Sequence, residues 1–186
     1  AEEALVSPHA SVDLTRRTAE VAVDIRVDRA TEVVGLDGRR VRDALVTVAA
    51  AEASGVARWC LATAVEHAGV REQFGARIGS FQAVKHLCAQ MLEHAEAITA
   101  VAWDAASAAE RDPAQWHFAA EVAGTVALDG AVRVAQDCIQ VLGGIGFTFE
   151  HDAHLYLRRA TALRSLLGSG ATHAAEVADL AVAGRR

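Results

Sequence analysis

Two short segments carry the residue types best suited to holding a phosphorylated ligand. In the first, VREQFGARIGSFQ, a guanidinium at Arg71 and an amide at Gln82 flank a tight turn. An arginine suits phosphate because its planar fork makes two parallel charged hydrogen bonds. The same segment could instead be an ordinary connection between two helices, with Gly75 ending one helix and Ser80 capping the next.

The second segment, QVLGGIGFTFEHDAH, brings three glycines together within four residues, from Gly143 to Gly146. These glycines could simply allow a tight chain reversal. They could also let a ligand lie against the backbone, whose N–H groups would then meet a phosphate or a purine edge. Alone, the pattern is weak, because it lacks the strand-then-helix setting of a dinucleotide fingerprint. His151 and His154 follow without an evident third ligand, so we predict no metal site.

Helices must position both segments. After a turn signal at 35–38, apolar residues recur at helical spacing through the rest of the chain. We predict helices over 40–73, 81–111, 114–142 and 152–167, and a last short helix over 171–183, with Asp152 as a helix cap. Long helices with short connections predict an all-α, antiparallel four-helix bundle.

The residues before the bundle predict one or two β-strands. Positions 20–28 alternate between apolar and polar residues, which is typical of a half-buried strand, and 11–14 could form another. Residues 1–9 read as a loop. One or two strands cannot form an independent sheet, so their partners would come from a longer protein or another chain. We therefore divide the chain into 1–36 and 37–186.

Composition narrows the classes of function. The chain has 186 residues, is 52% hydrophobic and carries a formal charge of −6. This acidic balance, without a basic cluster, argues against a nucleic-acid partner. No run of 18 apolar residues is free of charge, so we expect no membrane span. The three cysteines, Cys60, Cys88 and Cys138, are expected to be buried free thiols in a reducing compartment, the cytoplasm.

Taken together and in order, REQFGARIGSFQAVKH and QVLGGIGFTFEHDAHLYLRRA resemble the C-terminal half of an acyl-CoA dehydrogenase. SVDLTRRTAEVAVD resembles the end of that family's middle β domain, so the resemblance covers roughly Ser11 to the last residue. It implies that 1–36 is the tail of an incomplete β domain with a linker. It also implies that 37–186 is the family's C-terminal helical bundle, which binds FAD.

The resemblance implies that FAD is shared between subunits. One FAD would lie along the first segment, at Arg71, Glu72, Gln73, Phe74, Phe81 and Gln82. The adenosine or pyrophosphate of a FAD across a dimer interface would meet the second, at Gln140, Val141, Leu142, Gly143 and Gly144. Gly168 and Ser169 match a further contact segment near the end of the chain.

The resemblance also places the catalytic base. The family reaction removes the α-proton and the β-hydride of an acyl-CoA thioester; FAD takes the hydride and a carboxylate takes the proton. The usual base position falls on Leu167, and the alternative, 26 residues before Arg71, falls on Leu45. Leucine cannot take a proton. Asp43 remains a weak candidate and Glu52 a weaker one, although both could be ordinary helix or surface charges.

Three functions stay open. The leading hypothesis is a base-less, FAD-sharing subunit of a heteromeric oxidoreductase of fatty acid or sterol β-oxidation. It would act on an acyl-CoA beside a related, base-bearing chain, with an electron-transfer flavoprotein as acceptor. The second is a self-sufficient dehydrogenase whose base is Asp43 or lies in absent sequence. The third is a helical assembly module that has kept the fold and lost the chemistry.

Overall fold

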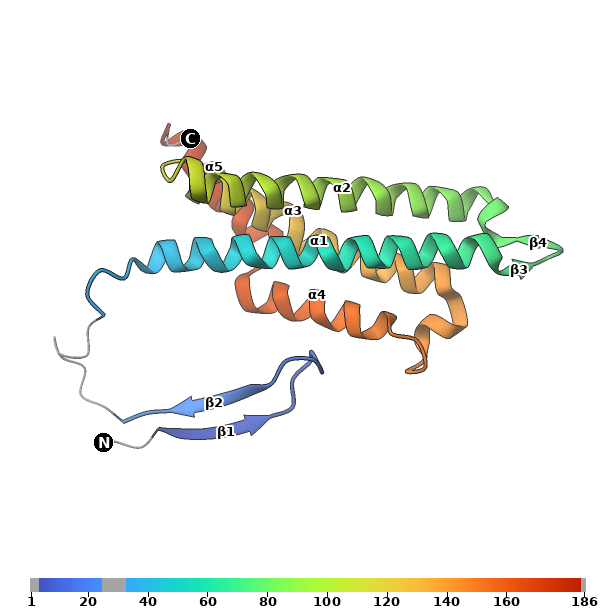
Figure 1. The fold of residues 1–186 in the computed structure, drawn as a ribbon, viewed down its shortest axis with the longest axis horizontal. Helices are drawn as coiled ribbons and strands as arrows, with labels where there is room; N and C mark the ends of the chain where they lie inside the picture. The colour runs from blue at the N-terminus through green and yellow to red at the C-terminus, as the bar shows by residue number, and fades with distance from the viewer. Residues whose placement is uncertain (1–3, 25–32, 185–186) are drawn as a thin grey trace.

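A computed structural model describes residues 4–24 and 33–184 (Figure 1). Four helices run alternately up and down and form an antiparallel bundle, and a fifth packs on α3 at one end. The helices are α1 (Gly38–Val70), α2 (Gln82–Arg111), α3 (Trp116–Leu142), α4 (Ala153–Leu167) and α5 (Gly170–Val182). The predicted all-α bundle is confirmed, and the helix bounds differ from the predicted ones by at most three residues.

Local signals explain where the helices begin and end. The Asp37 carboxylate accepts a hydrogen bond from the N–H of Arg39 at 2.9 Å and caps α1. The helix α2 ends at Arg111, just before Asp112-Pro113, because proline cannot continue a helix. Ser169 caps α5 by accepting a hydrogen bond from the N–H of Thr172. Asp152 lies at the predicted cap position of α4, but its side chain makes no capping bond.

The α1–α2 connection corrects one prediction. Glu72 and Gln73, predicted to end the first helix, instead form β3 (Glu72–Gln73), which pairs with β4 (Ala76–Arg77) in a small hairpin. The 3₁₀ turn η1 (Ile78–Ser80) follows. Phe74 and Gly75 form its two-residue loop, and both have positive φ, 54° and 78°. Positive φ at both positions is the requirement of the tightest hairpin turn. Gly75 therefore shapes this loop and does not end α1, and the Ser80 hydroxyl donates to the Arg77 carbonyl instead of capping α2.

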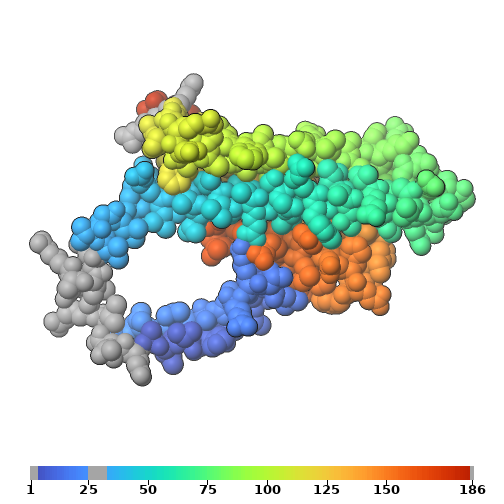
Figure 2. All heavy atoms as spheres, in the orientation of Figure 1, coloured from blue at the N-terminus to red at the C-terminus, as the bar shows by residue number. Residues whose placement is uncertain are grey.

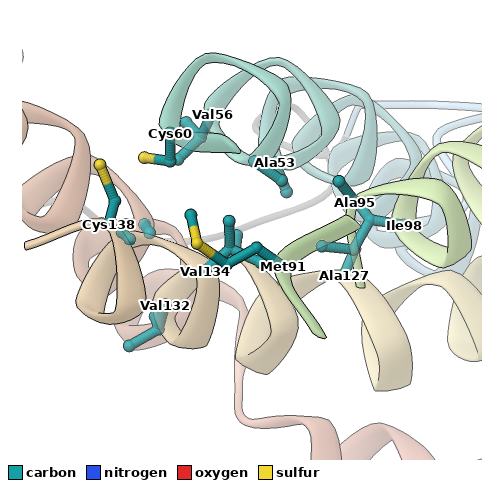
Figure 3. Packing of buried hydrophobic residues seen from close by; sticks show 14 of the residues in the cluster. Ala53, Val56, Cys60, Met91, Ala95, Ile98, Ala127, Val132, Val134 and Cys138 are labelled. Atoms are coloured by element: carbon teal, nitrogen blue, oxygen red, sulfur yellow. The ribbon is translucent and has the colours of Figure 1, made fainter. Parts of the chain in front are cut away.

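The core of the bundle is built mainly from alanine. Buried alanines line the contacts of α1, α2 and α3, with Met91, Ile98 and Val134 filling the space between them (Figure 3). Small side chains let the helices approach closely. Cys60 and Cys138, far apart in the sequence, face each other in this core. The neighbouring Cys138 thiol and burial raise the pKa of Cys60, so this thiol stays protonated.

The N-terminal strands differ from the prediction. The chain forms a hairpin of β1 (Leu5–His9) and β2 (Thr18–Ala22), so residues 5–9 are a strand and not a loop, and 11–14 are a turn and not a strand. Every residue of both strands is exposed, so the half-buried face predicted for 20–28 is absent from its described part, 20–24; residues 25–28 lie outside the described residues. Figure 2 shows that the hairpin meets the bundle at its turn, while the strands stand away from it.

The helix α1 is apolar around much of its surface. By length and composition alone it could cross a membrane, with a mean hydropathy of 1.3 over its best 18 residues. In the structure it packs against α2, α3 and α4 as a central helix of the bundle. The division of the chain at residue 36 stays a prediction.

Candidate functional site

The residues singled out from the sequence gather at two ends of the bundle. Arg71–Gln82 and Gln140–Gly144 lie at one end, which we call the tip, and Leu45 and Leu167–Ser169 lie towards the other end (Figure 1). Leu45 and Arg71 are 26 residues apart along α1, which is ~39 Å at the helical rise per residue. A dinucleotide bound at the tip therefore could not reach the Leu45 end of the same bundle.

The tip presents an aromatic ring to solvent beside an arginine. Phe74 is 94% exposed, and its ring meets that of Phe81 edge to face, with centroids 6.2 Å apart. A bulky residue with positive φ carries steric strain of about 1–2 kcal/mol. Arg71, Glu72, Gln73 and Gln82 are also exposed. The tip thus offers a charged and aromatic surface on a strained turn.

The three glycines of the second segment differ in whether the structure requires glycine there. Gly143 ends α3 with φ 62° and ψ −133°, a conformation that favours glycine. At Gly146 a Cβ would lie 2.9 Å from the carbonyl oxygen of Ile139, so glycine is required for packing. At Gly144 a Cβ would meet nothing within 4 Å, and φ is not positive. Nothing in the described chain requires glycine at 144, and the space in front of it is open.

The three residues before these glycines differ in how far they are buried. Gln140 is exposed, whereas Val141 and Leu142 are buried with their side chains in the core. Only the backbone of Val141 and Leu142 could meet a ligand. After the 3₁₀ turn η2 (Gly143–Phe147), His151 accepts a hydrogen bond from the N–H of Ala153, and His154 donates to the His151 carbonyl.

His67 connects the two tip segments. Burial lowers its pKa, and the charges of Arg71 and His151 lower it further. The arginine motif follows the end of α1 and the glycine motif follows the end of α3, so the fold places both at the same end of the bundle although they are about 70 residues apart in the sequence.

At the other end, both base positions are apolar. Leu45 is 53% exposed, and the next residue, Val46, is fully buried. Leu167 is half-buried and packs against a small cluster of Ala49, Leu128 and Leu163. Gly168 follows with φ 108°, and Ser169 caps α5. The first turns of α1 and the end of α4 thus lie side by side, without a carboxylate at Leu45 or Leu167.

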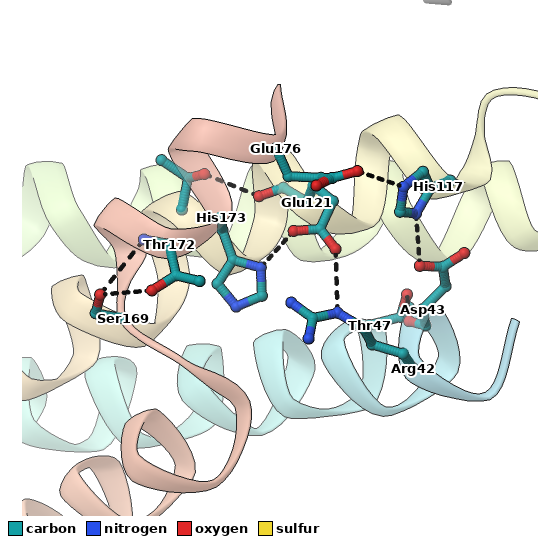
Figure 4. A network of polar contacts seen from close by, with 10 residues as sticks. Arg42, Asp43, Thr47, His117, Glu121, Ser169, Thr172, His173 and Glu176 are labelled. Atoms are coloured by element: carbon teal, nitrogen blue, oxygen red, sulfur yellow. Dashed lines mark hydrogen bonds and ion pairs between the residues drawn. The ribbon is translucent and has the colours of Figure 1, made fainter. Parts of the chain in front are cut away.

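Asp43 points away from the surface that carries Leu45. It is 2% exposed, and its Oδ1 accepts a hydrogen bond from Nδ1 of His117 on α3 at 2.8 Å (Figure 4). Asp43, His117 and Glu121 each place a possible metal-ligand atom within 4.8 Å of the others. Both carboxylates are already bonded within the chain, Glu121 to His173 and Arg42.

A buried ion network around Glu121 was not predicted from the sequence. His173 Nδ1 lies 2.6 Å from Glu121 Oε2, and Arg42 Nε lies 3.5 Å from Oε1 (Figure 4). Burial alone would raise the pKa of Glu121, but the hydrogen bond from His173 and the charges of His173, Arg42 and His117 hold it below its ordinary value. Two signals could have found it: a Glu inside the apolar run AAEVAG and a His inside ATHAAEVA.

A second ion network ties the N-terminal hairpin to the bundle. Arg159 of α4 lies 2.8 Å from Asp13 and 2.6 Å from Glu52, and Arg16 also contacts Glu52. A pocket of about 380 Å³ lies beside it, lined by residues that include Thr15, Tyr156 and Arg159. Glu52, a weak base candidate by sequence, is therefore a paired charge between the hairpin and the bundle.

Comparison with known proteins identifies relatives across the chain. The profile of the acyl-CoA dehydrogenase C-terminal domain matches residues 46–181. Acyl-CoA dehydrogenase FadE34 of Mycobacterium tuberculosis is 50% identical over the whole chain, and IpdE2 of the same species is 40% identical over 163 residues. Butyryl-CoA dehydrogenase of Megasphaera elsdenii superposes with a TM-score of 0.85 at 25% identity, over 96% of this chain.

A steroid acyl-CoA dehydrogenase, Tcur3481-Tcur3483, superposes equally well, at 26% identity over 97% of this chain. The chain spans 49% of each of these two solved chains, 47% of IpdE2 and 26% of FadE34.

Proposed function

Since the chain belongs to the acyl-CoA dehydrogenase family, we propose that it serves FAD-dependent α,β-dehydrogenation of an acyl-CoA thioester by supplying cofactor contacts and an oligomer interface, and not the base. When bound, FAD supplies the hydride acceptor. The rest of the site, including most of the acyl pocket, would come from sequence outside this chain or from a related chain.

The observation that carries the proposal is Gly144. Its missing side chain serves no contact in the described chain, and it lies at the same end of the bundle as Arg71 and the exposed Phe74. A flat or phosphorylated group lying against this backbone would explain the glycine. Arg71 would donate to a phosphate, Phe74 would offer its ring as an apolar surface, and Gln140 would offer its amide.

The geometry favours a cofactor shared between two bundles. The tip and the Leu45 end of one bundle are ~39 Å apart, so the cofactor held at the tip would serve a reaction centre in another chain. Gly168 and Ser169, beside Leu167, would contact a different cofactor molecule. This division motivates a homo- or heterotetramer, with an electron-transfer flavoprotein as the acceptor.

The apolar base positions support a partner that carries the base. Leu167 is packed into a hydrophobic cluster, and Leu45 projects from the opposite side of α1 to Asp43. Two residues are about 200° apart around a helix, so Asp43 and Leu45 cannot face the same ligand. The self-sufficient enzyme with Asp43 as base is therefore the weaker alternative. The non-catalytic assembly module leaves the strained, exposed Phe74 and the open Gly144 unexplained.

The substrate would be a fatty or sterol acyl-CoA. One structural relative is described as a steroid acyl-CoA dehydrogenase and another as a butyryl-CoA dehydrogenase, so chain length stays open. The three free thiols support a reducing compartment such as the cytoplasm.

The test is the visible spectrum of the native assembly before and after a panel of acyl-CoA thioesters. We expect a flavin band that bleaches with one member of the panel, and co-purification of a related, base-bearing chain. Gly144→Val should abolish the band without unfolding the protein, whereas Gly55→Val, an equally open site on α1, should retain it. A native assembly without flavin, or a homotetramer that turns over acyl-CoA by itself, would contradict the proposal.

A further inference from the structure

The segment that links α4 to α5, Leu167–Gly170, is fastened to α3 at unusually close range. A Cβ on Gly170 would lie 2.5 Å from the carbonyl oxygen of Thr125, so only glycine fits there. The Gly170 N–H donates to Asp129 Oδ2 at 3.0 Å, and Arg164 holds the other oxygen of Asp129 at 2.6 Å. We call residues 167–170 the α4–α5 turn.

The imidazole of His173 is a second contact that holds this part of the chain against α3. It is fully buried, and it fills a notch in α3 left by Gly124, where a Cβ would lie 2.6 Å from the ring. Its Nδ1 lies 2.6 Å from Glu121, which Arg42 contacts from α1 (Figure 4). Gly170 and His173 are the buried residues of α5, so this one side chain anchors the helix.

The other ring nitrogen faces the α4–α5 turn. His173 Nε2 has no hydrogen-bond partner among the residues that the structure describes. A Cβ built on Gly168 would lie 3.6 Å from it, in ordinary contact. The ring therefore lies directly behind Gly168. A buried nitrogen without a partner costs about 1–3 kcal/mol, so Nε2 itself does not stabilise the bundle.

His173 cannot itself be a base, because a ring with no exposed surface cannot reach a substrate carbon. We infer that His173 is a positioning residue that fixes Gly168 and Ser169 for contact with flavin. Its ring is held for this role by the Gly124 notch and by the hydrogen bond to Glu121. This inference rests on the proposed function. It gives the buried network a role in the site, through a segment that would touch the cofactor.

The experiment compares the native assembly with four variants. His173→Ala removes the ring, and Gly124→Ala pushes it out of its notch. His173→Gln keeps a hydrogen-bond donor for Glu121 and should keep the α4–α5 turn in its wild-type position. Ile98→Val removes one methyl group from a buried side chain of α2 and controls for a general loss of stability. The readouts are the FAD dissociation constant, the shape of the bound flavin band, and amide hydrogen exchange of residues 167–172.

We expect His173→Ala and Gly124→Ala to weaken FAD binding at least about tenfold, the effect of losing a supporting residue behind a ligand contact. Exchange should rise in residues 167–172 and stay unchanged in α2. His173→Gln and Ile98→Val should bind FAD as the wild type does. If His173→Ala does not fold, the FAD affinities of the two single variants Gly124→Ala and His173→Gln are compared instead.

Wild-type FAD binding in Gly124→Ala or His173→Ala would overturn the inference and leave the proposed function standing. So would an equal loss of FAD in Ile98→Val. A wild-type assembly that binds no FAD would overturn the proposed function, and this inference with it.

Discussion

His117 Nδ1 lies 2.8 Å from Asp43 Oδ1, across the contact between α3 and α1. The pair occupies the inner side of α1, whereas Leu45, two residues on, projects outward and is 53% exposed. The carboxylate closest in sequence to Leu45 is therefore committed to a contact inside the bundle. Its arrangement is that of a structural pair, because a base must reach the α-carbon of the substrate.

Replacing Asp43 with Asn tests this assignment directly. Asparagine can still accept the hydrogen bond from His117, so the fold should be kept, but it cannot take a proton. We expect flavin reduction by acyl-CoA in the native assembly to proceed at close to the wild-type rate. A loss of roughly a hundredfold or more, with flavin still bound, would identify Asp43 as the base. His117→Gln, which alters the same contact, serves as the control for structural effects.

Phe74→Asn should separate stability from cofactor binding. Asn-Gly is the pair preferred in a two-residue turn with positive φ at both positions, so the change should relieve strain. We expect the free energy of unfolding to rise by about 1 kcal/mol, since a non-glycine residue at this φ is strained by that order. Flavin binding should be lost because the variant lacks the phenyl ring of Phe74. Thermal melting of the protein and its visible spectrum measure the two effects.

A substitution at the neighbouring position should have the opposite effect on stability. Gly75 has φ 78°, so Gly75→Ala should destabilise the same hairpin. If Phe74→Asn lowered stability, the strain argument would be wrong. If it left flavin binding unchanged, Phe74 would have no role in the site.

Much of the bundle follows from local sequence. Asp112-Pro113 divides α2 from α3, Gly143 ends α3, and the apolar spacing fixes the length of each helix to within three residues. The errors fall at the two hairpins, where strand pairing and not apolar spacing decides the structure. β1 contains Pro8 and lacks an alternating pattern, so the sequence predicts a loop where the structure pairs His9 with Thr18 and Leu5 with Ala22. The sequence predicts helix as far as Gln73 because Glu72 and Gln73 favour helices when no turn overrides them, whereas these two residues form β3.

The tip segments were predictable because each is short and chemically distinctive. Arg71 and Gly144 could be chosen from the sequence, although only the structure shows that Gly144 faces open space. The Glu121–His173 contact was missed because its members are 52 residues apart, and each reads as a single polar residue in an apolar helix. Such isolated polar residues are usually surface positions, so periodicity alone gives no partner.

Arg159→Ala should release the N-terminal hairpin from the bundle. Arg159 contacts both Asp13 and Glu52, and Asp13 is 1% exposed. Burial alone would raise the pKa of Asp13, but hydrogen bonds from Thr15 and the charges of Arg159 and Arg16 hold it below its ordinary value. Leaving a buried carboxylate without its main partner costs about 3 kcal/mol. Hydrogen exchange of residues 5–22 should rise strongly.

The adjacent arginine gives a matched control. Arg158 donates to the carbonyl of Val12 at 3.3 Å and lies over the Phe149 ring at 5.8 Å, and it makes no ion pair with the residues that the structure describes. Arg158→Ala should change exchange in the hairpin much less. Equal effects of the two variants would show that the hairpin is not held by the Asp13–Arg159–Glu52 network.

Glu121 should make the stability of the bundle fall in acid. Its pKa in the folded protein is below its ordinary value of 4.5, so ionisation is favoured in the folded state. Its contribution is therefore fully present above about pH 4.5 and is lost as pH falls from there through the folded pKa. Glu121→Gln removes that contribution, because the neutral amide gains little from His173 and Arg42.

Urea denaturation at pH 7 and pH 4 measures this effect. The wild type should lose more stability between the two pH values than Glu121→Gln, which should already be less stable at pH 7. Glu110→Gln changes an exposed carboxylate on α2 and should lose as much as the wild type. Equal losses in all three proteins would show that the His173–Glu121 contact does not depend on the charge of Glu121. Its 2.6 Å hydrogen bond would then hold the α4–α5 turn without help from the ion pair.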